Sequence, residues 1–179
     1  MSLVLLGDSI FKRLYIEYYN LFSELSGIFC ISGITVKELY FLVKKNHNLL
    51  KSKCVVLMIG TNDILNQNEL IEVKTFLKVL IRYLIRLSVK LYLCDLIPIP
   101  AIFHSSIQVD SLKLYNSFIR SFQGVFCTIL HTYDYFTYNS KDYFFLYCQY
   151  YGRSKRIDMI HPNSHGLLVL KLFILNSCQ

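Results

Sequence analysis

Two short motifs, one near each end of the chain, contain the residue types of an acyl-transfer site. Gly7-Asp8-Ser9 follows a short apolar run and comes directly before a predicted helix. A serine at a helix N-terminus exposes its hydroxyl and its backbone N–H, and both are useful to a nucleophile. The same position also suits a serine that only caps the helix. The motif therefore predicts either a nucleophile or a cap at Ser9.

The second motif, Asp158-Met159-Ile160-His161-Pro162-Asn163, precedes the last predicted helix. A carboxylate three positions before a histidine on a loop can accept a hydrogen bond from the imidazole Nδ1–H. That contact would fix the tautomer of His161 and stabilise the imidazolium that forms when Nε2 takes a proton. The alternative is a loop histidine beside an unrelated aspartate. If the pair acts together, His161 is the general base and Asp158 orients it.

Two further loops offer hydrogen-bond donors to a developing oxyanion. In Gly60-Thr61-Asn62-Asp63 the amide of Asn62 is such a donor, or else the segment is only an Asx turn. In Ser32-Gly33-Ile34-Thr35 the backbone N–H of Gly33 is a second donor, or the glycine only turns the chain. We interpret Asp8 and Asp63 as acids that brace these loops. The six cysteines form no CxxC pair, and no histidine stands at metal-ligand spacing, so neither a zinc site nor a redox motif is indicated.

Short apolar runs alternate with segments of helical periodicity, and together they predict the elements that position these loops. The runs are Leu3–Leu6, Ile28–Ile31, Cys54–Ile59, Leu91–Leu96 and Val125–His131. Continuous apolarity indicates burial on both faces, as in a parallel sheet covered by helices. The segments 10–25, 35–46, 69–88, 110–122 and 163–177 are predicted to be the crossover helices. We expect a three-layer α/β fold with its site at the carboxyl ends of the strands.

Composition sets the class of protein. The chain has 179 residues, of which 54% are hydrophobic and 17% charged, and this excludes intrinsic disorder and predicts a single domain over 1–179. Mean hydropathy is +0.39, but no 18-residue window lacks a charge or turn residue, so no transmembrane segment is predicted. The first residues carry no basic region, which argues against a signal peptide and favours an intracellular location, cytoplasmic or nuclear.

The net charge of +7 favours an anionic partner. One basic stripe recurs every four residues on the predicted helix 69–88, and a second cluster comes just before Asp158. The residues concerned are Lys74, Lys78, Arg82, Arg86, Arg153, Lys155 and Arg156. Like charges at that helical spacing are mildly destabilising unless something anionic meets them. We predict anion binding here, for example to nucleic acid or another anionic surface; solvated basic faces are the alternative.

The four loop motifs together resemble those of the SGNH hydrolases, also called GDSL-like esterases and lipases. The matching blocks are Gly7-Asp8-Ser9, Gly33, Gly60-Thr61-Asn62-Asp63 and Asp158-x-x-His161-Pro162-Asn163, in the order of the family. The chain looks most like compact members: the platelet-activating-factor acetylhydrolase type, esterase domains of some non-LTR retrotransposons, and Oskar-type domains. The resemblance implies a flavodoxin-like, five-stranded parallel sheet of order 2-1-3-4-5 and an ester hydrolase that needs no metal or organic cofactor.

The resemblance also implies roles for the residues. Ser9 would attack the carbonyl, with His161 as base and then acid and Asp158 as its orienter. The backbone N–H groups of Ser9 and Gly33 and the amide of Asn62 would form the oxyanion hole. We therefore predict a serine esterase that hydrolyses a small acyl ester, such as an acetyl or short-chain ester, or a lipid. The alternative is a catalytically silent SGNH-like module that binds RNA or another acidic partner, similar to the Oskar domain, which has lost the catalytic residues of the family.

Overall fold

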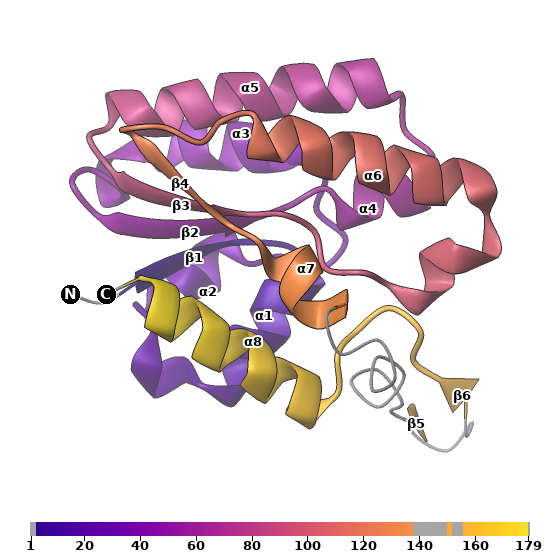
Figure 1. Ribbon diagram of the computed structural model, residues 1–179. Coiled ribbons are helices and arrows are strands. Elements are labelled where there is room, and N and C mark those ends of the chain that lie inside the picture. The colour runs from indigo at the N-terminus through magenta and orange to yellow at the C-terminus, as the bar shows by residue number, and fades with distance from the viewer. Residues whose placement is uncertain (1–2, 138–149, 152–155, 179) are drawn as a thin grey trace.

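A parallel sheet forms the centre of the protein (Figure 1). The computed structural model describes residues 3–137, 150–151 and 156–178. The four strands of the sheet are β1 (Leu3–Gly7), β2 (Cys54–Met58), β3 (Lys90–Cys94) and β4 (Cys127–Leu130). They lie in the order β1-β2-β3-β4, and each neighbouring pair is parallel. A short antiparallel pair, β5 (Tyr150–Tyr151) and β6 (Arg156–Ile157), lies apart from it.

Helices cover both faces of the sheet, so the predicted three-layer α/β plan is confirmed. Figure 1 shows α3, α5 and α6 on one face, with α1, α2 and α8 on the other. Their bounds are α1 (Ser9–Glu17), α2 (Ser26–Phe29), α3 (Val36–Lys45), α5 (Leu70–Arg86), α6 (Ser106–Arg120) and α8 (Ser164–Ser177). Two short helices, α4 (Thr61–Leu65) and α7 (Thr132–Thr137), follow β2 and β4 and were not predicted. None of the helices in the described part of the chain is long and apolar enough to cross a membrane.

The core lies between the sheet and these helices. Every residue of β1 and β2 is buried, as continuous apolar strands covered on both faces should be. On α5 the buried side chains are Val73, Leu77, Leu80, Ile81 and Leu84. They follow the spacing of three and four residues that places side chains on one face of a helix. The sequence pattern therefore fixes which side of α5 meets the sheet.

The prediction of a fifth strand at Ile28–Ile31 is wrong. Its first residues belong to α2, and the segment reaches the sheet only at its end, through one parallel bridge between Cys30 and Gly7. Three separate groups occupy the free edge of β1 instead of a strand: the Ser23 N–H donates to Leu3 O (2.8 Å), the Ser26 hydroxyl accepts from Leu5 N (2.9 Å), and Ile31 N–H donates to Gly7 O (3.1 Å). Since this segment already satisfies the edge, no continuous ladder forms. The order 2-1-3-4-5, which needs five strands, is not confirmed.

Candidate active site

The serine of the first motif begins α1 directly at the end of β1. A Cβ atom added at Gly7 would lie 2.4 Å from the carbonyl oxygen of Met58, so the close approach of β1 and β2 requires glycine there. Asp8 is the N-cap of α1, and its Oδ1 accepts a hydrogen bond from Ile10 N at 3.0 Å. The cap is therefore Asp8, and Ser9 is left as the first residue of the helix.

The loop of the second motif is held in place by its own backbone and by a neighbouring segment. Asp158 Oδ1 accepts from the backbone N–H groups of Ile160 and His161, both at 3.0 Å. The Ala101 N–H donates to Met159 O at 3.0 Å, which ties the loop to the 3-10 helix η3 (Pro100–His104). Asn163 then caps α8 by accepting from Gly166 N at 2.9 Å. These contacts hold His161 between the hydrogen-bonded turn at Asp158 and the start of α8.

The two motifs meet at the carboxyl edge of the sheet. His161 Nε2 lies 2.8 Å from Ser9 Oγ, although the two residues are 152 positions apart in the chain. On the other side of the ring, His161 Nδ1 lies 2.9 Å from Asp158 Oδ2 and 3.1 Å from Oδ1. The three side chains form one hydrogen-bonded chain from carboxylate to hydroxyl. This is the arrangement in which an imidazole can take the proton of a serine.

The electrostatics of the site favour a neutral imidazole beside an ionised carboxylate. Burial lowers the pKa of His161 below its usual 6.5; the Asp158 carboxylate opposes this shift, and the Arg13 cation adds to it. Burial would raise the pKa of Asp158, but hydrogen bonds from His161 N and Ile160 N and the nearby imidazole bring it below the usual 3.8. At neutral pH His161 therefore donates through Nδ1 to Asp158 and accepts through Nε2 from Ser9.

Arg13 joins this site although the sequence analysis missed it. Its Nη2 lies 3.2 Å from Asp158 Oδ2, the same oxygen that faces His161 Nδ1. Arg13 is four residues after Ser9 on α1, a spacing that places both side chains on one face of the helix. That spacing is the signal that could have identified it. Arg13 links the helix that carries the serine to the loop that carries the acid.

The two loops predicted to supply oxyanion donors are in contact with each other. Asn62, on α4, donates a hydrogen bond from Nδ2 to Ile34 O at 3.0 Å, and an amide nitrogen carries a second N–H. Gly33, directly before Ile34, has a φ of +79°, in the left-handed region that favours glycine. Asp63 Oδ2 accepts from Val36 N at 3.0 Å, so its predicted role as a brace is confirmed. The oxyanion roles of Ser9, Gly33 and Asn62 stay predictions.

Of the seven predicted anion-binding residues, the structure describes the side chains of the four on α5. Lys78, Arg82 and Arg86 are exposed along α5, and Lys74 is half-buried with its Nζ 5.6 Å from the centre of the Phe118 ring. Arg153 and Lys155 lie outside the described residues, and only the backbone of Arg156 is described, on β6. Over the ranges that the structure describes, no three His, Cys, Asp or Glu side chains come together as a metal site would require.

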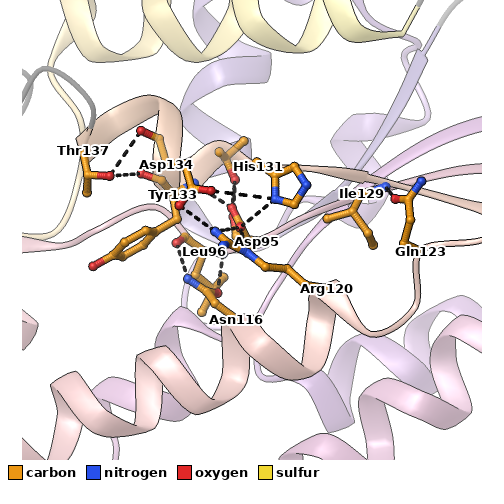
Figure 2. A network of polar contacts seen from close by, with 11 residues as sticks. Asp95, Leu96, Asn116, Arg120, Gln123, Ile129, His131, Tyr133, Asp134 and Thr137 are labelled. Carbon is orange, nitrogen blue, oxygen red and sulfur yellow. Dashed lines mark hydrogen bonds and ion pairs between the residues drawn. The ribbon is translucent and has the colours of Figure 1, made fainter.

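A second polar network at the same edge of the sheet was also missed (Figure 2). Asp95, directly after β3, is fully buried, and its Oδ2 accepts from Arg120 Nε (2.8 Å) and Nη2 (2.5 Å). Its Oδ1 accepts from Tyr133 N (2.6 Å) and from the Thr132 hydroxyl (3.0 Å). Arg120 also donates to Asp134 at 2.8 Å. Every lone-pair face of Asp95 is thus occupied, as a structural brace between β3, α6 and α7 requires.

Comparison with known proteins identifies the family. Residues 4–161 match the OSK domain. Among solved structures, the OSK domain of Drosophila Oskar is similar to this chain with a TM-score of 0.77 and 19% identity, over 98% of this chain and 87% of the other. A lipolytic protein of the G-D-S-L family from Veillonella parvula has a TM-score of 0.71 and 16% identity, over 98% and 97%. A putative acylhydrolase from Bacteroides fragilis has a TM-score of 0.74 and 18% identity, over 99% and 86%.

No curated protein sequence matches this chain. The structural neighbours are nevertheless of the two kinds that the sequence motifs resembled, Oskar domains and G-D-S-L hydrolases, so that resemblance is confirmed. At these identities the neighbours establish the α/β fold with its parallel sheet. The match over residues 4–161 establishes more, because it covers most of the sequence: the chain belongs to the OSK domain family.

Proposed function

We propose that the protein is a serine ester hydrolase whose catalytic residues are Ser9, His161 and Asp158. One observation carries the proposal: His161 bridges Ser9 Oγ at 2.8 Å and Asp158 Oδ2 at 2.9 Å through its two ring nitrogens. A histidine with only a structural role has no need of a serine hydroxyl at a helix start on one side and a buried carboxylate on the other. The resemblance to G-D-S-L hydrolases supports the same assignment.

The proposed reaction is a two-step acyl transfer. Ser9 Oγ attacks the carbonyl carbon as its proton moves to His161 Nε2, and the carbonyl oxygen becomes an oxyanion. His161 then gives this proton to the leaving alcohol oxygen, the bond from carbon to that oxygen breaks, and an acyl-serine remains. A water molecule then attacks the acyl carbon as His161 takes its proton, the bond from this carbon to Ser9 Oγ breaks, the carboxylic acid leaves, and His161 returns the proton to Ser9 Oγ. Asp158 stays ionised throughout and stabilises the imidazolium.

The oxyanion would be stabilised by the backbone N–H groups of Ser9 and Gly33 and by the second amide N–H of Asn62. A donor of this kind is worth about 10²–10³ in kcat. We therefore expect Asn62→Ala to lower kcat by about 10²-fold with a smaller change in KM. Because Asn62 also holds Ile34 O, circular dichroism must show that the variant keeps its fold. An unchanged kcat would remove Asn62 from the oxyanion hole.

The test of the proposed function is hydrolysis of p-nitrophenyl acetate, butyrate and octanoate by the wild type and by Ser9→Ala. We expect turnover to fall by about 10³-fold or more in Ser9→Ala. The matched control is Ser117→Ala on the exposed face of α6, which should keep full activity. A fluorophosphonate should add its mass once to the wild type and not to Ser9→Ala. Equal turnover by wild type and Ser9→Ala would contradict the proposal.

A catalytically silent binding module is the second candidate. Membership of the OSK family and the exposed cations Lys78, Arg82 and Arg86 on α5 favour it. RNA or another acidic partner would then be bound electrostatically, and binding would weaken steeply with salt because each neutralised phosphate releases counterions. Two results would identify this candidate. Ester turnover by the wild type would not exceed that of Ser9→Ala, and both proteins would bind RNA equally, with an affinity that falls as the salt concentration rises. The geometry at Ser9 favours the hydrolase.

A further inference from the structure

A surface with only positive charge lies at the amino-terminal edge of the sheet, opposite the Ser9 site. We call this surface the basic edge; its residues are Lys51, Lys53, Arg86 and Lys90, and all four are exposed. Backbone hydrogen bonds hold the loops that carry them together, from Ser52 N to Leu87 O at 3.2 Å and from Lys90 N to Lys53 O at 2.9 Å. The four cations are therefore fixed near one another by the fold.

No acid balances the basic edge. The connecting segments 46–53, 86–90 and 121–126 contain no Asp or Glu, and Lys44 and Lys45 add two more exposed cations in the last turn of α3. None of the four cations of the basic edge forms an ion pair with any residue that the structure describes. Clustered like charges repel one another and attract anions from solution. The basic edge therefore suits an anionic partner.

An apolar loop tip projects beside the basic edge. Val125 and Phe126, in the loop that joins α6 to β4, are 95% and 70% exposed. The Gly124 N–H donates to Cys127 O at 3.0 Å and closes this loop. Cys127, the first residue of β4, pairs with Leu91 near the start of β3, so the loop tip comes directly before this end of the sheet. Figure 1 shows the loop on the same side of the molecule as the start of β1 and the end of α8.

We propose that the basic edge and the Val125–Phe126 tip form a docking surface for an anionic lipid bilayer. The two apolar side chains would enter the interface between headgroups and acyl chains, and the cations would contact the lipid phosphates and carboxylates. The apolar tip matches the hydrocarbon interior of such a bilayer, and the basic residues beside it match the anionic headgroups at the bilayer surface.

Two other occupants fit the same surface less well. A nucleic acid would neutralise the lysines and could stack a base on Phe126, but it has no apolar phase in which to bury Val125. A second copy of the chain would bring two surfaces of the same charge together, which is repulsive. Among these partners only a bilayer offers both an anionic surface and a hydrocarbon layer.

This docking does not rest on the proposed hydrolase. The basic edge is at the start of the strands and Ser9 is at their carboxyl ends, so a docked molecule would hold the candidate active site away from the bilayer. Ser9→Ala should therefore bind vesicles as tightly as the wild type. A failure of the esterase assay and a failure of vesicle binding would be separate results.

The experiment is flotation with vesicles of phosphatidylcholine alone and of phosphatidylcholine with roughly 30% phosphatidylserine. We expect binding only to the anionic vesicles, weaker at higher salt. The double variant Val125→Ser with Phe126→Ser should bind at least about tenfold more weakly because the apolar anchor is lost. Lys53→Gln with Lys90→Gln should lose about fivefold per cation. The matched control, Lys12→Gln with Lys113→Gln on the exposed faces of α1 and α6, removes the same charge away from the basic edge and should bind within about twofold of the wild type.

Three outcomes would overturn the proposal. The first is no binding of the wild type to anionic vesicles. The second is an equal loss of binding in the Lys12 and Lys113 control, which would mean a diffuse attraction by the net charge of +7. The third is vesicle binding that the serine variants do not weaken, together with tight binding of single-stranded RNA through Lys53 and Lys90. All the substituted side chains are exposed, so folding should not change, and thermal unfolding checks this.

Discussion

Asp158 and Asp95 are two buried aspartates at the carboxyl edge of one sheet, and each is paired with an arginine. Arg13 Nη2 lies 3.2 Å from Asp158 Oδ2, and Arg120 Nη2 lies 2.5 Å from Asp95 Oδ2. Each carboxylate also accepts backbone N–H groups, two at Asp158 and one at Asp95. By residue type and burial alone, either cluster would pass as a functional site.

The histidines separate the two clusters. His161 Nδ1 is within 2.9 Å of its aspartate and Nε2 is within 2.8 Å of Ser9 Oγ. His131 Nδ1 is 3.8 Å from Asp95 Oδ2, beyond hydrogen-bond reach, and the side chain is 54% exposed. Asp95 contacts groups of α6 and α7, whereas Asp158 is connected through an imidazole to a hydroxyl. The comparison shows that the two clusters differ in the contact of the second ring nitrogen of the histidine. A histidine can take the proton of a hydroxyl only if that nitrogen faces one, as His161 Nε2 faces Ser9 Oγ.

The strongest test of this difference is Asp158→Asn. An amide N–H in place of Oδ2 would face His161 Nδ1, force the ring proton onto Nε2 and remove the acceptor that Ser9 needs. We expect kcat for p-nitrophenyl acetate to fall by about 10³–10⁴-fold. The remaining oxygen can still accept from Ile160 N and His161 N, but the new amide also faces Arg13 Nη2, so the free energy of unfolding should fall by about 2–3 kcal/mol. Near-normal kcat would mean that the cluster at Asp158 is a brace like the one at Asp95.

The converse substitution is Asp95→Asn. An amide N–H in place of Oδ2 would face the Arg120 guanidinium and leave its charge partly uncompensated. We expect the free energy of unfolding in urea to fall by about 3 kcal/mol. Ester turnover of the folded fraction should stay within about tenfold of the wild type, because Asp95 contacts neither Ser9 nor His161.

Asp134→Asn is the matched control for this network. Asp134 binds the same arginine at 2.8 Å but is 56% exposed, so its loss should cost less than about 1 kcal/mol. Equal destabilisation by the two substitutions would show that burial of Asp95 is not what gives the network its strength.

The same two clusters show what the sequence can predict. Asp158 and His161 are three residues apart, and their turn is closed by hydrogen bonds within the motif, so the local sequence carries the information. The partners of Asp95 lie 25 to 38 residues away, on α6 and α7, and no local motif connects them. Arg13 has a local signal in its helical spacing from Ser9, but its contact with Asp158 forms only after the chain has folded.

The same distinction between local and long-range contacts applies to the helices and strands. The stripe of α5 and the continuous apolar strands β1 and β2 were predictable, because their own periodicity determines which face is buried. The run Ile28–Ile31 was read as a strand, and periodicity alone cannot separate a short buried strand from a helical turn. In the structure the Ser26 hydroxyl accepts a hydrogen bond from Leu5 N at the edge of β1, where a neighbouring strand would otherwise pair. A side chain completing a backbone hydrogen bond leaves no pattern in the sequence.

Asp8, a third buried aspartate at this edge, sharpens the comparison because it lacks an arginine. Burial raises its pKa to about 6 from 3.8, and the hydrogen bond from Ile10 N and the nearby Thr61 hydroxyl only partly oppose this shift. Asp8 Oδ2 has no well-formed hydrogen bond to any described residue, and neither does the Thr61 hydroxyl beside it. A raised carboxyl pKa contributes stability below pH 3.8 that is lost as pH rises through 6.

We therefore expect Asp8→Asn to stabilise the protein at about pH 8 by about 2 kcal/mol, since no charge is then buried and asparagine is an equally good helix cap. The gain over the wild type should shrink as pH falls below 6 and vanish near 3.8. Urea unfolding of both proteins across this range measures it. A gain that is the same at every pH would mean that the pKa of Asp8 is the same in the folded and the unfolded protein.

The smallest effect on ester turnover is expected from Arg13→Met. This substitution leaves Asp158 without an arginine partner. The Arg13 cation lowers the pKa of His161, so its removal should raise that pKa and move the acidic limb of the kcat/KM profile to higher pH. Activity on the plateau should fall less than about tenfold, because Asp158 keeps its hydrogen bonds to Ile160 N and His161 N.

Two further variants separate the charge of Arg13 from its packing. Arg13→Lys keeps the cation and should keep the acidic limb close to the wild-type position. Lys12→Met removes the neighbouring exposed cation of α1 and should leave the limb unmoved, because solvent screens a charge in that position. If the acidic limb stays in place in Arg13→Met, or moves equally in Lys12→Met, then Arg13 does not influence the pKa of His161. Its role would then be that of Arg120, which only binds an aspartate.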